Sequence, residues 1–212
     1  MNKLERRVVV TGMGAVTPIG NSVEDFWKGI KEGKCGIDTI TRFDVSDYKV
    51  KLAAEIKDLN IEDYMDRRSA KRLDRYSQLA MIAAKEAMQD SGISADNTDM
   101  TRMACIVGSG IGGLGTEQTK VLINKGHDRI SPMYIPMSIS NMASGNIAIE
   151  YGIKGESFAL VTACATGTHC IGESYRLIKH GYQDFALTGG SEGSITETAI
   201  SGFTNIKALS QS

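Results

Sequence analysis

Cys164 is the residue of this sequence whose position best suits a nucleophile. It stands between the apolar run 157–162, which is expected to form a strand, and a helix expected from about residue 165 to residue 180. The positive end of a helix dipole favours a thiolate, and the free N–H groups of a first helical turn can stabilise an oxyanion. The small residues at 166–168 allow a substrate or other backbone to approach closely. These features alone also fit a second interpretation, in which Cys164 is a small buried apolar residue.

A nucleophilic cysteine commonly works with a base, and none of the three histidines is well placed to be that base. His169 follows Cys164 by five residues on the same expected helix, and neighbours on a helix face lie three or four residues apart, so it should point away from the thiol. His180 at the helix end is expected to stabilise the helix dipole, and His127 lies in a polar loop and is expected to be solvated. A cysteine hydrolase is therefore disfavoured.

Strands and helices are expected to alternate along the chain. Apolar runs predict strands at 7–11, 103–107, 157–162 and 184–189, with a weak one at 52–56. Helices are predicted from Asn21 or Ser22 to Lys31 and over 69–91, 116–124, 138–150 and 165–180. This alternation indicates an α/β protein with a mainly parallel sheet.

Composition narrows the class of protein. The 212 residues have 42% hydrophobic and 23% charged content, which is ordinary for a globular domain, and a formal net charge of −1, which argues against bulk attraction to nucleic acid or membrane surfaces. No apolar run approaches the roughly 20 residues of a membrane span. The four cysteines lack C-x-x-C spacing, so free thiols, a reducing compartment and a cytoplasmic location are expected.

Several motifs, in order along the chain, resemble those of the β-ketoacyl-[acyl-carrier-protein] synthases, and most of all the elongating type II condensing enzyme. The nucleophile segment of that family is similar to Val161-Thr-Ala-Cys164-Ala-Thr-Gly-Thr-His-Cys170, preceded by Tyr151-Gly-Ile-Lys-Gly155. The other matching stretches are Val8-Val-Val-Thr-Gly-Met-Gly14, Thr17-Pro-Ile-Gly20, Gly108-Ser-Gly-Ile-Gly-Gly-Leu-Gly115, Ser131-Pro-Met-Tyr-Ile-Pro136 and Gly189-Gly-Ser-Glu192.

The resemblance implies a thiolase-like layered α/β/α/β/α fold, of which residues 1–212 would be the N-terminal half. It also implies that Cys164 holds an acyl chain as a thioester and that a malonyl carrier protein then condenses with it by decarboxylation in fatty-acid elongation. Family members carry two histidines in a C-terminal half, one in a His-Gly-Thr motif and one in a Gly-His motif, and neither motif occurs here. The chain alone is therefore expected to be inactive.

The glycine-rich stretch Gly108 to Gly113 has two interpretations. It fits G-x-G-x-x-G after a strand, as in dinucleotide sites, but the required acidic residue about twenty positions on would fall in the loop 127–136. In the resembling family the loop borders the active site, and Ile111 matches a residue of the acyl tunnel. Tyr134 matches an aromatic supplied across a homodimer interface, and Phe203 another aromatic that borders the pocket. Ordinary core packing would explain each side chain as well.

Four cations are predicted to share one helix face, because Arg68, Lys71, Arg72 and Arg75 follow i, i+3, i+4, i+7 spacing. Such a face is commonly just solvated surface. In the resembling family the positions matching Arg68, Lys71, Arg72 and Lys207 contact the acyl carrier protein, whose acidic surface a basic face would attract.

The sequence therefore favours an acyltransferase that binds an acyl carrier protein, forms a homodimer and needs no cofactor or metal of its own, since the carrier supplies the phosphopantetheine. Two alternatives remain. One is a non-catalytic half that binds acyl chains or carriers, and the other is a thiolase-type acyltransferase that acts on coenzyme A esters.

Overall fold

The computed structural model describes residues 6–210, and its core is a three-stranded parallel sheet. The strands are β3 (Met103–Gly108), β4 (Ser157–Phe158) and β5 (Phe185–Gly190), in the order β4-β3-β5. Every residue of β3 is buried, as expected of the central strand of a sheet covered on both faces. The predicted α/β class and parallel sheet are confirmed.

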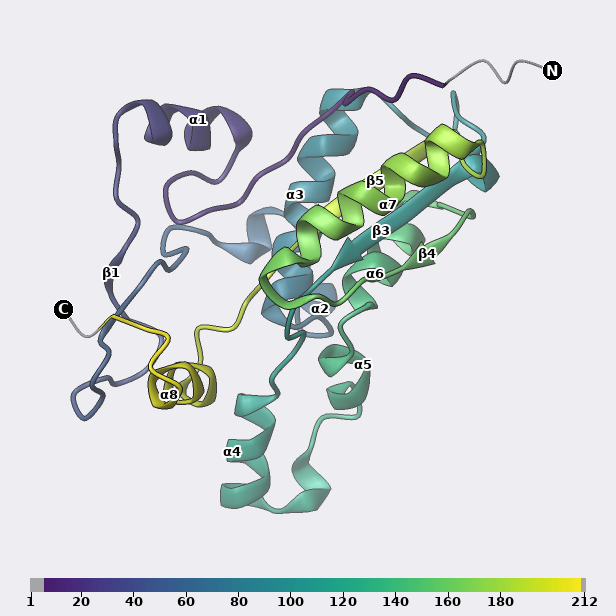
Figure 1. Ribbon diagram of the computed structural model, residues 1–212. Helices are drawn as coiled ribbons and strands as arrows, with labels where there is room; N and C mark the ends of the chain where they lie inside the picture. The colour runs from purple at the N-terminus through teal and green to yellow at the C-terminus, as the bar shows by residue number, and fades with distance from the viewer. Residues whose placement is uncertain (1–5, 211–212) are drawn as a thin grey trace.

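Helices cover both faces of this sheet (Figure 1). Side chains alternate along β3, so that Ala104 and Ile106 pack against α7 (Thr166–His180), while Met103, Cys105 and Val107 pack on the opposite side. That opposite side is covered by α6 (Met142–Tyr151) and α3 (Arg75–Ser91). The sheet and these three helices form the main core.

Capping residues set the ends of several helices, and the start of one of them was predicted at Asn21 or Ser22. Ser22 accepts a hydrogen bond from the Asp25 N–H and begins α1 (Val23–Lys31). Gly92, Gly152 and Gly181 end α3, α6 and α7 in the left-handed conformation that glycine adopts without steric cost.

The remaining elements form smaller units around the core. β1 (Asp38–Thr39) and β2 (Leu52–Ala53) pair antiparallel, and a second cluster joins Ile40, Val45 and Val50 to Ile200 of α8 (Glu197–Asn205). The other helices are α2 (Arg67–Ala70), α4 (Thr116–Lys125), α5 (Tyr134–Ser138) and the short 3₁₀ turns η1 (Ile61–Asp63), η2 (Met100–Arg102) and η3 (His127–Arg129). Within the described part of the chain, no helix has the length and apolar character needed to cross a membrane.

The strand predicted at 7–11 is wrong. This segment is extended but joins no sheet (Figure 1). The side chain of Val10 is 80% exposed. Just beyond it, the N–H groups of Met13 and Ala15 donate to the carboxylates of Asp90 and Glu86 on α3. These hydrogen bonds fasten the chain to a helix.

The helix predicted over 69–91 is also wrong as a continuous element. α2 ends at Ala70, and the chain turns before Asp74 caps α3 by accepting a hydrogen bond from the Tyr76 N–H. Asp residues favour caps because their side chains compete with the helical backbone for hydrogen bonds. The four cations therefore do not lie along one helix face.

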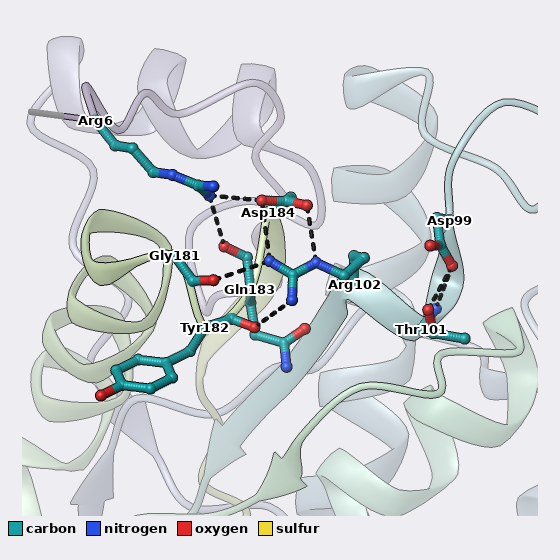
Figure 2. Close-up of polar contacts among 8 residues, drawn as sticks. All are labelled: Arg6, Asp99, Thr101, Arg102, Gly181, Tyr182, Gln183 and Asp184. Atoms are coloured by element: carbon teal, nitrogen blue, oxygen red, sulfur yellow. Dashed lines mark hydrogen bonds and ion pairs between the residues drawn. The ribbon is translucent and has the colours of Figure 1, made fainter. Parts of the chain in front are cut away.

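An ion-pair cluster joins the amino ends of β3 and β5 to the end of α7 (Figure 2). Arg102 donates to both carboxylate oxygens of Asp184, at 2.9 and 3.3 Å, and to the carbonyls of Gly181 and Tyr182. Arg6 donates to the same carboxylate at 2.6 Å. These guanidinium groups, Arg102 first, lower the pKa of Asp184 from 3.8 to about 2.

This cluster should stabilise the fold in a pH-dependent way. The pKa of Asp184 is depressed, so its contribution is complete above 3.8 and is lost as pH falls toward 2. Asp184→Asn should lower the free energy of unfolding at pH 7 by about 1 kcal/mol, a modest value because solvent screens the partly exposed pair. Urea unfolding at pH 7 and pH 3 should show the difference shrinking at the lower pH. The exposed control Asp96→Asn should change neither value, and equal stabilities of Asp184→Asn and wild type at pH 7 would contradict the assignment.

Candidate active site

Cys164 lies on a sharp turn between the sheet and α7. The turn is a single 3₁₀ element, η4 (Ala163–Ala165), and α7 begins at the next residue. Ala163 has φ 51°, in the left-handed region that residues other than glycine rarely enter. The side chain of Cys164 is exposed. The thiol lies on the turn that leads into the helix, as predicted, but the strand expected over 157–162 ends at Phe158, so residues 159–162 separate the strand from this turn.

Glycines let the first turn of α7 rest directly on the ends of two strands. A Cβ on Gly190 would lie 2.8 Å from the Cα of Gly167, so a side chain there would push helix and strand apart. A Cβ on Gly108 would meet the side chain of Thr166 at 2.6 Å and the Sγ of Cys170 at 3.1 Å. The close approach expected for the small residues after Cys164 is therefore observed.

The loop from Gly108 to Gly113 lies beside this turn because both follow the carboxyl ends of parallel strands. A Cβ on Gly110 would stand 3.0 Å from the carbonyl oxygen of Ala163. Ile111, the next residue in this loop, is 37% exposed. The structure therefore brings the loop that carries Ile111 next to the Cys164 turn.

Glu192 holds that loop in place. Its Oε2 accepts from the Ile111 N–H at 3.1 Å, and its Oε1 accepts from the hydroxyls of Ser109 and Ser194. In the sequence, Glu192 stands out only as the last residue of the motif Gly189 to Glu192, which gives it no role. The signal that points to it is its position just after a predicted strand parallel to the strand before the loop.

The same hydrogen bonds disfavour the dinucleotide alternative. The Ile111 N–H is bonded to Glu192, and the Gly112 N–H donates to Ser109 Oγ at 2.9 Å. A phosphate-binding loop needs such N–H groups free to face an anion. Here an internal carboxylate and a hydroxyl already occupy them.

The two predicted pocket aromatics lie in different places. Tyr134 begins α5, packs against Gly115 and lines a cavity of about 360 Å³ together with Gly112 and Met137. Phe203 lies on α8, is 40% exposed and does not line that cavity. The structure thus brings Tyr134 near the glycine loop and leaves Phe203 on a separate element.

The four cysteines, all of which are free, differ in accessibility. Cys105 and Cys170 are fully buried, and desolvation raises the pKa of the Cys105 thiol to about 11. Cys35 and Cys164 are exposed. A reagent in solution therefore has two thiols to choose between.

The three histidines lie in the elements predicted from the sequence, and one of them makes an unexpected contact. His127 and His180 are exposed, and His127 pairs with Asp128. His169 contacts the Cys164 turn, because its Nδ1 lies 2.7 Å from the hydroxyl of Thr162. Helical spacing from Cys164 gave no sign of this contact, since Thr162 precedes the helix.

Residues 5–212 match the family described as "Beta-ketoacyl synthase, N-terminal domain". The chain belongs to the β-ketoacyl synthase family. A relative from Staphylococcus aureus named "3-oxoacyl-[acyl-carrier-protein] synthase 2" is 46% identical over 97% of this chain and 50% of its own length. A Synechocystis protein of the same name is 43% identical over 99% of this chain and 51% of its own length. The chain thus spans about half the length of these curated relatives.

Solved structures give the same fold. The "ishigamide ketosynthase/chain length factor" superposes with a TM-score of 0.88 at 28% identity, covering 97% of this chain and 52% of that one. A β-ketoacyl synthase from Burkholderia phymatum superposes with a TM-score of 0.84 at 24% identity, covering 97% of this chain and 51% of that one. The thiolase-like ketosynthase fold predicted from the motifs is confirmed.

The basic residues of this β-ketoacyl synthase chain divide into two groups. Arg68, Lys71 and Arg72 are exposed in and just after α2, and Lys207 is exposed beyond α8. Arg75 instead lies partly buried at the start of α3 against Gly193, where burial, and then Arg42, lower its pKa. The predicted inclusion of Arg75 in one exposed basic face is wrong, because the chain turns before Asp74.

Cys164 should react with a neutral alkylating reagent faster than the other three thiols of this ketosynthase chain. Its turn leads into the positive end of α7, which can stabilise the negative charge that the sulfur carries as it attacks, whereas Cys105 and Cys170 are buried. Limiting iodoacetamide followed by peptide mapping measures the four rates in one sample. Cys35 is the internal control for exposure, and equal or faster labelling of Cys35 would contradict activation of Cys164.

Proposed function

We propose that the protein formed with this chain catalyses decarboxylative Claisen condensation in fatty-acid elongation. The thiolate of Cys164 attacks the thioester carbonyl of an acyl carrier protein and releases the phosphopantetheine thiol of the carrier, which leaves the acyl group on Cys164. Malonyl carrier protein then loses CO2, and its carbanion attacks the Cys164 thioester. The C–S bond breaks, and a 3-ketoacyl carrier protein two carbons longer is formed.

The observation that carries this proposal is the exposed thiol on the turn before α7, in a chain that matches the ketosynthase family along its length. The backbone N–H of Cys164 would donate to the oxyanion of the tetrahedral intermediate. The two histidines implied by the resemblance would come from a second half, as the length of the relatives suggests, and that half would also supply a second donor to the oxyanion. Residues 1–212 would then form the N-terminal half-domain and would not condense substrates alone.

The acyl chain would pass the glycine loop. Ile111 follows Gly110, which packs against Ala163, and Tyr134 lines the cavity at the far end of the same loop. In a homodimer, Tyr134 would also reach the pocket of the second copy, as the resemblance implies. Helices α4 and α5 project from the core (Figure 1). Ile123 on α4 and Ile135 on α5 are exposed. Phe203 would border the pocket in the complete protein.

The proposed partner is an acyl carrier protein, which carries phosphopantetheine as the only prosthetic group of the reaction. The enzyme would work as a homodimer in the cytoplasm. A thiolase-type enzyme would take acyl groups from coenzyme A, and a non-catalytic half would not take them covalently. The exposed Arg68, Lys71 and Arg72 favour a protein carrier, because an acidic protein offers many charges to such a surface.

Acyl transfer tests the function directly. Incubation with an acyl carrier protein charged with an acyl chain should add the mass of one acyl group to Cys164, and hydroxylamine should remove it. Cys164→Ala should abolish the adduct, while Cys35→Ala should retain it. Acylation from acyl coenzyme A but not from the carrier would support the thiolase-type alternative, and no adduct on Cys164 from either donor would support the non-catalytic one.

Charge reversal tests the carrier surface. Lys71→Glu with Arg72→Glu should weaken carrier binding by about 1–3 kcal/mol, mainly through the association rate and more at low salt, because exposed charges steer encounter. Surface plasmon resonance at two salt concentrations measures both rates. The control pair Lys28→Glu with Lys31→Glu places the same charges on α1 and should leave binding almost unchanged. Equal weakening by both pairs would show a general charge effect and remove the role of this surface.

A further inference from the structure

The left-handed conformation of Ala163 must be stabilised by neighbouring residues. A residue with a Cβ loses about 1–2 kcal/mol in the left-handed region, so the turn would relax unless its neighbours prevented it. On one side, the carbonyl of Ala163 faces Gly110 of the glycine loop. On the other side stands Thr162, the residue that precedes the turn.

All three polar groups of Thr162 bond to the segment after Cys164. Its carbonyl accepts from the Ala165 N–H at 3.1 Å, and its N–H donates to Thr166 Oγ1 at 2.9 Å. Its hydroxyl meets His169 Nδ1 at 2.7 Å. Thr162 is therefore fastened across Cys164 to the first two turns of α7.

Two side chains of α7 form hydrogen bonds with Thr162. They lie on one face of the helix, because Thr166 and His169 are three residues apart. Thr166 is 4% exposed beneath the turn, and His169 stands one turn further along the helix, exposed. The contact with His169, a residue of α7, therefore restrains the side-chain rotamer of Thr162. The N–H of Cys164 takes part in none of these bonds.

We propose that Thr162, oriented by His169, is a positioning residue for the Cys164 nucleophile. The pair holds Ala163 in its left-handed conformation and so keeps the thiol at the positive end of α7. The acyl-transfer role of the thiol belongs to the proposed function, on which this inference rests. The geometric effect on the thiol can be measured without that reaction.

The test measures the iodoacetamide rate of Cys164 relative to that of Cys35 in the same chain. Thr162→Val keeps the shape of the side chain and removes its hydroxyl, and it should slow Cys164 about threefold to tenfold, as expected for one lost hydrogen bond. His169→Leu should have the same direction of effect.

Conservative variants and matched controls complete the design. Thr162→Ser restores the hydroxyl and His169→Asn places a polar atom near the position of Nδ1, so both should recover most of the wild-type ratio. Thr168→Val and His180→Asn, exposed positions on the same helix, should leave the ratio unchanged. Far-ultraviolet circular dichroism confirms that each variant keeps its helices.

Two results would overturn the inference. One is a folded Thr162→Val variant with the wild-type ratio, and the other is a Thr162→Ser variant as slow as Thr162→Val. Failure of the proposed function is distinguishable, because it would appear as a lack of acyl transfer to Cys164 while the alkylation ratios still followed Thr162 and His169.

Discussion

The close packing of α7 on the ends of β3 and β5 is the constraint on which the rest of the structure depends. It requires Gly167 to meet Gly190 without side chains between them, and it leaves no room for a Cβ on Gly108, which faces the side chain of Thr166. Interiors are packed tightly enough that one added methylene is felt, so these contacts fix the height of the helix over the sheet. The turn that carries Cys164 fills the remaining distance between sheet and helix, and its geometry follows from that height.

Much of this core could be predicted from the sequence because its signals are local. The buried run at β3 and the helix from Thr166 to His180 follow from periodicity and from the residues at their ends. The β-branched run at 7–11 shows only that the backbone is extended. Whether such a run joins a sheet depends on a partner far away in sequence, and here the bonds of Met13 and Ala15 lead to α3 instead.

The candidate active site could also be predicted only in part from the sequence. Cys164 and the glycine loop were found because residue type and neighbouring elements identify them. Glu192 and Thr162 escaped attention because their role lies in what they contact: Glu192 meets a loop about eighty residues earlier, and Thr162 meets a histidine that helical spacing from Cys164 had set aside. The stripe of four cations failed for another reason, since the i, i+3, i+4 pattern assumes an unbroken helix and Asp74 starts a new one.

The two ends of α7 are fixed by different kinds of interaction, and the difference suits their positions. At the start, the close contacts of glycines and the hydrogen bonds of Thr162 act over short distances and define the position of the thiol. At the far end, Arg102 binds the carbonyls of Gly181 and Tyr182 together with Asp184, so a charged network anchors the helix there (Figure 2). Coulomb interactions weaken with distance and with salt, and the 15 residues of α7 span about 22 Å, which exceeds the Debye length of roughly 8 Å at physiological ionic strength. The anchoring charges can therefore stabilise the far end of the helix while the thiol at its other end experiences mainly the helix dipole.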